Sequence, residues 1–265
     1  GEVVVEPDEY VEQRIYTKRW HDTEKRVART IRDMLGSKRR PLFEEASKPV
    51  APEGATPEEI AKLGLPTDDQ WRIIDLVRKN PLAILDGGPG VGKSFSQQWL
   101  MNAVEEQGLE VHLCAPTGKA ARRMTEVTGH EAKTIHRLLK FAPYQVGGGG
   151  FQHNAENPLV GDLIIVDESS MLSLDLADSL FQAIPENMHV LLVGDPDQLP
   201  PVGAGKLFDD LIQSNLVPRI HLTKIFRQAA RSMIIQNSRR INEGKFPYLK
   251  KEDAEKSLNI EMLND

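Results

Sequence analysis

The stretch that decides the fold is Gly87-Gly88-Pro89-Gly90-Val91-Gly92-Lys93-Ser94, which satisfies the pattern G-x-x-x-x-G-K-[S/T]. It follows the apolar run Leu82–Asp86 and precedes a segment of helical character, Phe95–Gln107. Glycines let backbone N–H groups turn inward around phosphate oxygens, and the N-terminus of the next helix adds a positive dipole end. Lys93 is expected to reach the β- and γ-phosphates of a nucleotide, and the Ser94 hydroxyl to ligate Mg²⁺. The stretch therefore predicts a nucleotide-binding loop; a plain glycine-rich turn is the alternative.

The segment around this loop alternates short β-type runs with helical segments. The runs are Leu82–Asp86, Val111–Ala115, Leu163–Val166 and Val190–Val193. Such alternation is typical of a parallel sheet with helices on both faces. We therefore expect an α/β fold with its ligand at the carboxyl ends of the strands.

An acidic pair, Asp167-Glu168, directly follows the run Leu163–Val166. The carboxyl ends of parallel strands meet at one edge of the sheet, so this pair is expected near the loop. Asp167 is predicted to hold Mg²⁺, directly or through water. Glu168 is predicted to orient and deprotonate the attacking water, which indicates a hydrolase rather than a kinase.

Length and composition are those of an ordinary globular chain. It has 265 residues, of which 40% are hydrophobic and 27% charged, and its net charge is −6 at pH 7. No apolar run approaches the ~20 residues that a membrane span needs, and the N-terminus GEVVVEPDEY lacks signal-peptide character. The lone Cys114 cannot form an internal disulfide, which favours a reducing, cytoplasmic setting. Because the chain starts at Gly1, we expect a processed or shortened piece.

Charge is distributed unevenly along the chain. A second basic stretch, Arg219 to Lys251, follows a first one that contains Lys119, Arg122, Arg123, Lys133, Arg137 and Lys140. The negative net charge argues against a histone-like cationic protein, but local basic patches are compatible with nucleic-acid binding. Solvated helix faces are the alternative interpretation of these runs.

The flanking segments are less regular. The first forty residues are predicted to form a charged helix with an apolar stripe of Ile15, Val27, Ile31, Met34 and Leu35. The stretch from Pro41 to Pro66 contains five prolines, both ends included, which favours a linker, with a short helix at Pro57–Leu63. The glycine-rich segment Phe141–Leu159 interrupts the alternation and is predicted to be an inserted loop or hairpin.

Five further segments resemble those of superfamily 1 helicases, above all the RecD-like DNA helicases. They are APTGKAA at 115–121, KTIHRLL at 133–139, VDESSM at 166–171, VGDPDQLPPVG at 193–203 and LTKIFRQ at 222–228. The resemblance covers roughly Asp68 to Gln228, in the order of that family. It implies a P-loop NTPase domain of RecA-like fold. The family generally carries Thr where this chain has Ser94, a difference that keeps the hydroxyl.

The resemblance also implies roles around the nucleotide. Gln70 matches a glutamine that reads adenine, because an amide both donates and accepts hydrogen bonds; solvent exposure is the alternative. Gln198 matches a residue that contacts the γ-phosphate, whereas Asp195 is expected to be only a turn residue. Arg227 matches an arginine that reaches the γ-phosphate from the domain boundary.

Single-stranded DNA is the second ligand that the resemblance implies. Its contacts would be Pro116, Thr117 and Lys119 in the first segment, with Thr134 and His136 in the second. A buried core histidine is the alternative for His136. The insertion 141–159 matches in place a strand-separating hairpin, whose Phe151 and Tyr144 would stack on a base; a Gly-rich loop without this role is the alternative.

Together these features predict part of an ATP-dependent DNA helicase that uses ATP and Mg²⁺. The resemblance implies that the whole enzyme moves 5′ to 3′ on single-stranded DNA and serves repair or recombination. A P-loop ATPase that does not unwind, or a nucleotide-dependent DNA-binding switch, is the alternative. The expected regions are a helical accessory region and linker (1–66), a first RecA-like domain (67–222) and the truncated start of a second (223–265). Expected partners are single-stranded DNA, duplex junctions, and helicase-nuclease subunits or a single-strand-binding protein, with no membrane. Because it lacks the later arginine that the family supplies from the second domain, the isolated chain is expected to be weakly active or inactive.

Overall fold

A six-stranded parallel sheet forms the centre of the computed structural model, which describes residues 2–7, 14–54, 63–143, 150–224 and 232–249. The strand order is β10-β3-β9-β8-β4-β5, and all neighbours are parallel. The strands are β3 (Leu82–Gly87), β4 (Val111–Ala115), β5 (Ala132–Thr134), β8 (Leu163–Val166), β9 (His189–Gly194) and β10 (Arg219–Leu222). The predicted α/β class and the four predicted strands are confirmed, and β5 and β10 are additional to them.

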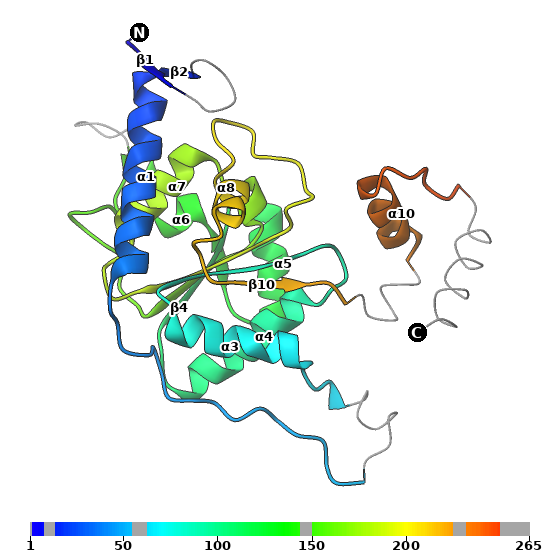
Figure 1. Ribbon diagram of the computed structural model, residues 1–265. Coiled ribbons are helices and arrows are strands. Elements are labelled where there is room, and N and C mark those ends of the chain that lie inside the picture. The colour runs from blue at the N-terminus through cyan, green and yellow to red at the C-terminus, as the bar shows by residue number, and fades with distance from the viewer. Residues whose placement is uncertain (1, 8–13, 55–62, 144–149, 225–231, 250–265) are drawn as a thin grey trace.

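Helices cover both faces of this sheet (Figure 1). They are α1 (Lys18–Gly36), α3 (Asp68–Lys79), α4 (Lys93–Glu106), α5 (Gly118–Thr128), α6 (Ile135–Leu138), the 3₁₀ turn η1 (Ser169–Met171), α7 (Leu174–Ala183) and α8 (Leu207–Ser214). A further helix, α10 (Met233–Asn242), has no buried residue and lies apart from the sheet in Figure 1. Leu82 and Ile84 pack with α1, α7 and α8, whereas Ala83 and Leu85 pack with α3 and α4. Alternate residues of a strand point to opposite faces, so a sheet covered on both sides requires continuous apolar strands.

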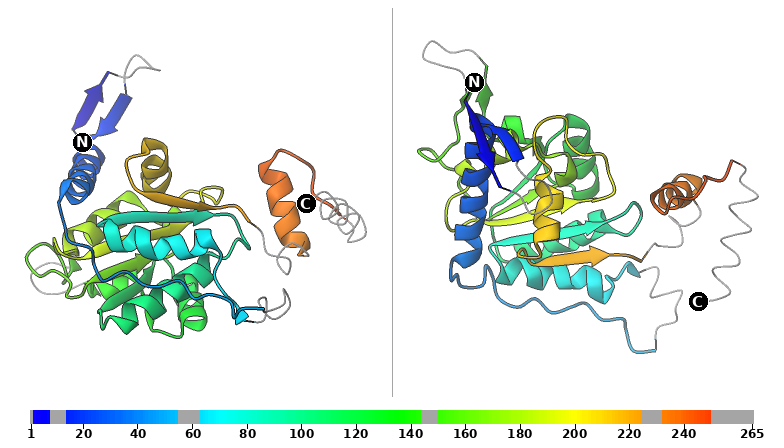
Figure 2. Two further views of the ribbon diagram at one scale, coloured as in Figure 1. Left: turned by 60° about the horizontal axis from the view of Figure 1, so that its bottom comes forward. Right: turned by 45° about the horizontal axis from the view of Figure 1, so that its top comes forward.

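The N-terminal segment differs from its prediction as one long helix. Residues before Lys18 form an antiparallel pair of strands, β1 (Val3–Glu6) and β2 (Arg14–Thr17), and these stand clear of the sheet in Figure 2. The run of β-branched valines in β1 favours a strand. Ile15 is therefore 72% exposed on β2 and is not part of the apolar stripe. The helix α1 also ends at Gly36, before the basic residues 38–40.

The rest of the predicted stripe is confirmed and packs directly on the sheet. Val27, Ile31 and Met34 are buried in the same core as β3 and α7, and Leu35 is partly buried against it. After α1 the chain runs along α3, where Leu42 N–H donates to the Arg78 carbonyl at 2.8 Å. The short helix predicted at Pro57–Leu63 falls almost wholly outside the described residues, and the boundary at residue 66 stays a prediction.

The insertion 141–159 contains a hairpin. Its strands β6 (Phe141–Ala142) and β7 (Gly150–Phe151) pair antiparallel, with Phe141 opposite Phe151. Residues 144–149, including Tyr144, lie outside the described residues. The chain re-enters the core at Leu159, which is 4% exposed.

No helix in the described ranges is long and apolar enough to cross a membrane. The division of the chain at residue 223 also stays a prediction. In that last region α10 carries exposed Ile234 and Ile241, and Phe246 and Leu249 follow it with their side chains also exposed.

Candidate nucleotide-binding site

The phosphate loop connects β3 directly to α4, as the sequence predicts. Gly92 takes a left-handed conformation, with φ = +91°, as the residue that precedes the first turn of α4. Only glycine adopts this backbone without strain. The first N–H groups of α4 have no partner within the helix and point toward the loop, which is a favourable place for phosphate oxygens.

Lys93, the first residue of α4, folds back over this loop. Its Nζ donates to the carbonyl oxygens of Gly87 and Gly88, the latter at 2.9 Å. Burial lowers the pKa of Lys93, and the nearby carboxylates of Asp195 and Glu168 oppose that shift. The ammonium is therefore held at the loop, desolvated and surrounded by negative charge. Ser94 follows it and is half-buried.

The acidic pair lies at the end of β8. Asp167 N–H donates to the Cys114 carbonyl at 2.9 Å, and Glu168 N–H donates to Asp167 Oδ1 at 2.9 Å. Glu168 has a left-handed backbone, with φ = +51° and ψ = +41°, which is uncommon for a residue with a side chain. Burial raises the pKa of Asp167, although the hydrogen bond from Glu168 lowers it.

Asp195 and Gln198 lie in the turn after β9. Asp195 Oδ1 accepts from Asp197 N–H at 3.1 Å, and its carbonyl accepts from Gln198 N–H at 3.1 Å, which makes it a turn residue as expected. It is more than that, because it is 4% exposed and close enough to influence Lys93. Burial raises the pKa of Asp195. Gln198 itself is exposed.

Gln70 lies at a cavity between α3, the phosphate loop and β10. It is 1% exposed, so the solvent-exposed alternative is wrong. Its Oε1 accepts from Thr67 N–H at 3.1 Å, while Thr67 Oγ1 accepts from Gln70 N–H at 3.2 Å, a reciprocal cap of α3. Among the described residues, Gln70 Nε2 has no hydrogen-bond partner. The cavity is about 180 Å³ and is lined by Thr67, Asp68, Asp69, Gln70, Val91, Leu222, Thr223 and Lys224.

Two further buried polar groups were not found from the sequence. Ser170 Oγ, like Gln70 Nε2, has no hydrogen-bond partner in the described part of the chain, whereas the Gln97 side chain lies against Asp167 and its hydrogen bond lowers the pKa of that carboxyl. Gln97 lies one turn after Lys93 and beside Asp167, and Ser170 follows Glu168 by two residues. A buried polar atom without a partner costs free energy, so such atoms mark places where a ligand completes the structure.

These groups fit a nucleotide with a divalent cation. The described residues contain no cluster of three or more His, Cys, Asp or Glu side chains that could hold a metal by themselves. Mg²⁺ is usually bound by one or two carboxylates together with substrate phosphates and water. The Ser94 hydroxyl and the Asp167 carboxylate are the oxygen ligands that such a site would draw from this chain.

The candidate DNA contacts lie at the carboxyl ends of the neighbouring strands β4 and β5. Pro116 and Thr117 follow β4, and Thr134 ends β5 opposite Ala115. Thr117 Oγ1 accepts from Ala120 N–H at 3.3 Å, so this hydroxyl caps α5. Thr134 Oγ1 accepts in the same way from Arg137 N–H at 3.2 Å and caps α6.

His136 lies on the outside of α6, so the buried-core alternative is wrong. Its ring contacts those of Phe141 and Phe151, each with centroids 5.5 Å apart. Phe141 and Phe151 contact each other at 5.0 Å across the hairpin. Phe151 is half-buried against the core, whereas Phe141 is 46% exposed. The three rings thus join the proposed DNA segment to the base of the hairpin.

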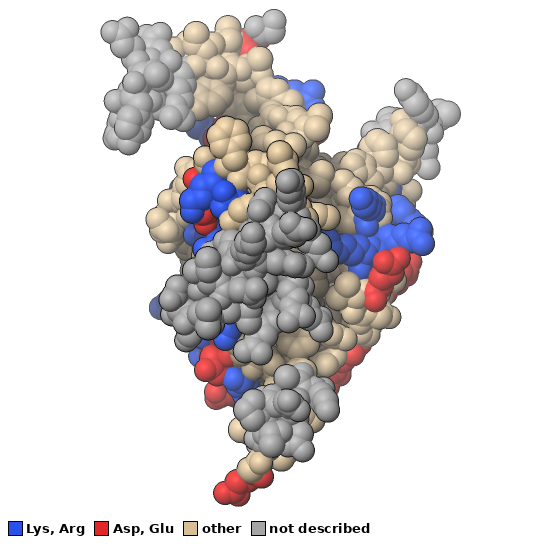
Figure 3. Space-filling view, turned by 90° about the vertical axis from the view of Figure 1, so that its right-hand side faces the viewer, with Lys and Arg blue, Asp and Glu red and all other residues tan. Residues whose placement is uncertain are grey.

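The basic side chains of α5 and its surroundings fall into two groups. Arg122 and Lys133 pair with Glu126 and Glu131, whereas no ion pair involves the exposed Lys119 in the described structure. Figure 3 shows one face of the molecule, where Lys and Arg side chains gather in separate patches next to Asp and Glu. A basic run in sequence is therefore only partly available to bind an anion.

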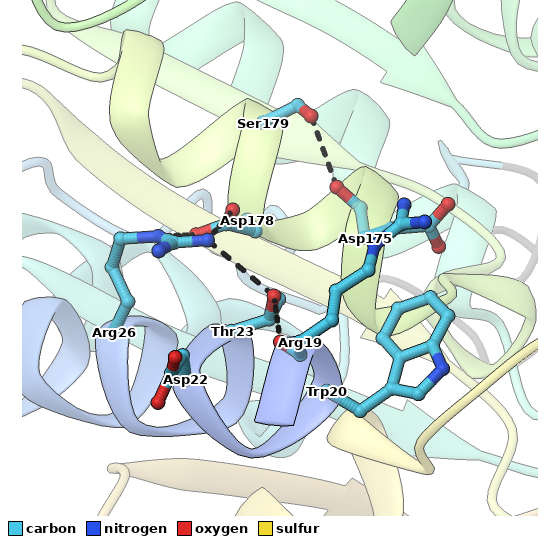
Figure 4. Close-up of a pocket in the computed structure, with 8 residues that line it drawn as sticks. All are labelled: Arg19, Trp20, Asp22, Thr23, Arg26, Asp175, Asp178 and Ser179. Atoms are coloured by element: carbon cyan, nitrogen blue, oxygen red, sulfur yellow. Dashed lines mark hydrogen bonds and ion pairs between the residues drawn. The ribbon is translucent and has the colours of Figure 1, made fainter. Parts of the chain in front are cut away.

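A larger cavity, about 380 Å³, lies between α1 and α7 (Figure 4). None of the candidate nucleotide or DNA residues lines it. Arg26 on α1 and Asp178 on α7 form a two-pronged ion pair there, with N–O distances of 2.8 and 2.7 Å. This pair ties α1 to α7.

The fold and this site define a P-loop nucleotide-binding domain. The sequence model of the AAA domain family matches residues 66–261, and the chain belongs to that family. It is 43% identical over 236 residues to the ATP-dependent RecD2 DNA helicase of Deinococcus radiodurans, with 89% of this chain and 31% of that protein aligned. It is 35% identical over 185 residues to the RecBCD enzyme subunit RecD of Mycolicibacterium smegmatis, with 61% of this chain and 33% of that protein aligned.

A solved structure shares the fold. The crystal structure of Pif1 helicase from Candida albicans superimposes with a TM-score of 0.51 and 21% identity, over 69% of this chain and 45% of that one. The chain spans about a third of the length of the RecD and RecD2 relatives. The predicted resemblance to RecD-like helicases is therefore confirmed for a part of such a protein.

Proposed function

We propose that this chain is the nucleotide-binding part of an ATP-dependent DNA helicase. The observation that carries the proposal is the convergence of three features at one edge of the sheet. These are the phosphate loop with Lys93, the Asp167-Glu168 pair, and the buried Gln70 amide, whose Nε2 has no partner among the described residues. The names of the relatives, a RecD2 DNA helicase and a RecBCD subunit, support DNA as the second ligand.

Binding of ATP would use groups that are poorly satisfied without it. Gln70 Nε2 would donate to an acceptor on adenine, since its Oε1 is already engaged by Thr67. Lys93 would exchange the neutral carbonyls of Gly87 and Gly88 for phosphate oxygens, and a charged acceptor makes a stronger hydrogen bond. The first N–H groups of α4 would share the same oxygens.

Hydrolysis would depend on the residues after β8 and β9. Ser94 and Asp167 would hold Mg²⁺, which when bound neutralises charge on the phosphate oxygens. Glu168 would orient the attacking water and accept its proton as the water oxygen attacks the γ-phosphorus, while the bond from that phosphorus to the β,γ-bridging oxygen breaks and ADP leaves. Gln198 would contact the γ-phosphate. Arg227, which lies outside the described residues, would add a guanidinium there and stays a prediction.

The DNA would cross the neighbouring strand ends. Lys119 and the helix starts capped by Thr117 and Thr134 would contact phosphates, and the ring cluster would present a face for stacking. Movement 5′ to 3′, strand separation by the hairpin and the partners (duplex junctions, helicase-nuclease subunits or a single-strand-binding protein) are parts of the same proposal. So is a cytoplasmic location.

The test is ATP turnover by the complete polypeptide with and without single-stranded DNA, alongside unwinding of a forked duplex. We expect DNA to stimulate turnover, and Glu168→Gln to abolish it while ATP still binds. If single-stranded DNA does not change the rate of ATP turnover, the helicase proposal is contradicted and an ATPase of another kind is favoured. Nucleotide-dependent DNA binding without turnover would favour a switch.

A further inference from the structure

A buried carboxylate lies directly under the phosphate loop and has no part in the proposed function. Asp86 is fully buried on β3, and the next residue, Gly87, begins the loop. An ionised carboxylate is tolerated in the interior only when charged partners and hydrogen bonds compensate for its lost hydration. The partners of Asp86 therefore identify what the start of the loop depends on.

Both oxygens of Asp86 are bound by side chains of β10. Arg219 donates from Nε to Oδ1 and from an Nη atom to Oδ2, each at 2.6 Å. His221 Nδ1 lies 2.7 Å from Oδ2, on the same face of β10 because it is two residues further along the strand. The hydrogen bond to Asp86 raises the pKa of Arg219. This two-pronged geometry fixes direction as well as distance, which a lysine could not do.

The strand that supplies these partners is held at the edge of the sheet. In the described sheet, β10 pairs only with β3, and its register places His221 beside Asp86 and Leu222 beside Gly87. The approach is very close, because a Cβ on Gly87 would lie 2.5 Å from the Leu222 carbonyl oxygen. Any shift of β10 relative to β3 would therefore disturb the first residue of the loop.

The end of β10 also forms part of the candidate base cavity. Leu222, Thr223 and Lys224 line it opposite Gln70, and Val91 of the loop closes another side. Arg219, His221 and Asp86 do not line the cavity. They lie on β3 and β10, just before the loop and before the residues of β10 that line the cavity.

We propose that Arg219 is a positioning residue for nucleotide binding. By holding Asp86 it fixes β10 against the start of the phosphate loop, and so fixes the wall of the base cavity relative to the phosphate site. The inference rests on the proposed nucleotide site and adds to it a supporting cluster of Asp86, Arg219 and His221.

The molecule contains a matched control for the ion pair. Arg26 and Asp178 form the same two-pronged contact between α1 and α7. The exposed fractions of the side chains are 48% and 11% in that pair, against 29% and 0% for Arg219 and Asp86. Loss of either guanidinium leaves a largely buried carboxylate, so both changes should lower the unfolding midpoint. Only one pair touches the phosphate loop.

The experiment measures the dissociation constant of a fluorescent ATP analogue with Mg²⁺, well below the lowest unfolding midpoint. The proteins are the wild type, Lys93→Ala, Arg219→Gln, Arg219→Lys and Arg26→Gln. We expect Arg219→Gln to weaken binding about 10–100-fold, as for outer-shell partners of metal ligands. Arg219→Lys keeps the positive charge but loses the two-pronged contact with Asp86, so it should weaken binding of the analogue less. Arg26→Gln should bind the analogue as the wild type does.

Each outcome decides between the two proposals. A wild type that binds no analogue, or a Lys93→Ala variant that binds it equally well, contradicts the nucleotide site itself. If that site holds, wild-type affinity in both Arg219 variants overturns the positioning role, and so does an equal loss in Arg26→Gln and Arg219→Gln. Should Arg219→Gln fail to fold, Arg219→Lys decides by the same comparison with Arg26→Gln.

Discussion

The two halves of the carboxyl edge of the sheet hold charge in different ways. In the nucleotide half, burial lowers the pKa of Lys93 and raises the pKa of Asp167 and Asp195. In the other half, which carries the candidate DNA contacts after β4 and β5, Lys119 and His136 are exposed to water. Charges that are desolvated in advance act strongly on a ligand and are little affected by salt, whereas exposed charges are screened within about 10 Å. Substitutions should therefore have large effects in the first half and small, salt-dependent effects in the second.

The largest effect is expected at Glu168, which follows the half-buried Asp167 and has a left-handed backbone. Glu168→Gln should reduce ATP turnover by about 10²–10⁴-fold, because an amide cannot accept the proton of water. Binding of ATP should persist, since the side chain keeps its size and hydrogen-bonding capacity. Turnover and the dissociation constant are measured on the complete polypeptide. Unchanged turnover would remove Glu168 from the role of base.

The second largest effect is expected at Lys93, the half-buried cation at the phosphate loop. Charge-assisted hydrogen bonds are worth about 1.5–3 kcal/mol each, so loss of two phosphate contacts should weaken ATP binding on the order of 100-fold or more. The fold should survive Lys93→Ala, because the hydrogen bonds of Lys93 Nζ go to carbonyls of its own loop. Calorimetric titration measures this, with Lys25→Ala on α1 as the control. Equal affinities in the two variants would contradict the prediction.

The elements that could be predicted from the sequence are those whose pattern is local in the chain. The strands β3, β8 and β9 are continuous apolar runs because the sheet is covered on both faces, and this pattern is local. The edge strand β10 alternates Arg219 and His221 with apolar residues, a pattern that four residues cannot distinguish from a loop. The N-terminal strands were missed because the charged helix that follows them dominated the pattern.

The candidate site divides in the same way. The phosphate loop and Asp167-Glu168 are contiguous in sequence, so their chemistry could be predicted from spacing. The sequence Thr67-Asp68-Asp69-Gln70 is a local signal for the start of α3, but the burial of Gln70 depends on packing and has no such signal. The ion pair of Asp86 and Arg219 joins residues 133 positions apart. It depends on which strand lies at the edge of the sheet, and no sequence spacing encodes that.

A third, smaller effect concerns the stability of the nucleotide half without ligand. Since burial raises the pKa of Asp167, the folded chain binds a proton there more readily than the unfolded chain does. Stability therefore falls as pH rises from the ordinary carboxyl pKa through the raised one, and it stays lower at neutral pH. Asp167→Asn should raise the unfolding midpoint at pH 7. The difference in midpoint between this variant and the wild type should become smaller toward pH 4.5.

Thermal unfolding followed by circular dichroism measures this difference. An effect of about 1 kcal/mol would shift the midpoint by about 2–4 °C for a chain of this size. Asp33→Asn, at an exposed position on α1, is the control. If Asp167→Asn is less stable than the wild type at pH 7, the Asp167 carboxylate stabilises the folded state instead of destabilising it.

The smallest effect is expected at Lys119. If this exposed lysine contacts one phosphate of single-stranded DNA, Lys119→Ala should weaken binding uniformly across sequences. The slope of log K against log salt should become shallower by about 0.7. Arg122→Ala is the matched control on the same helix, because Arg122 is already paired with Glu126 at 3.2 Å and should change the slope less. An unchanged slope in both variants would mean that the basic side chains of α5 form a solvated helix face and do not contact DNA.

The same titration, repeated with and without Mg²⁺ and an ATP analogue, tests whether the two halves are separate. They share β4, since Asp167 N–H donates to the Cys114 carbonyl and Ala115 lies beside Thr134. If the halves act independently, the contribution of Lys119 to the slope is the same with and without nucleotide. A contribution that depends on nucleotide would mean that the two sites are coupled, and thermodynamic coupling between two ligands is reciprocal. ATP affinity should then change by the same factor when DNA is added, and Lys119→Ala should reduce that factor.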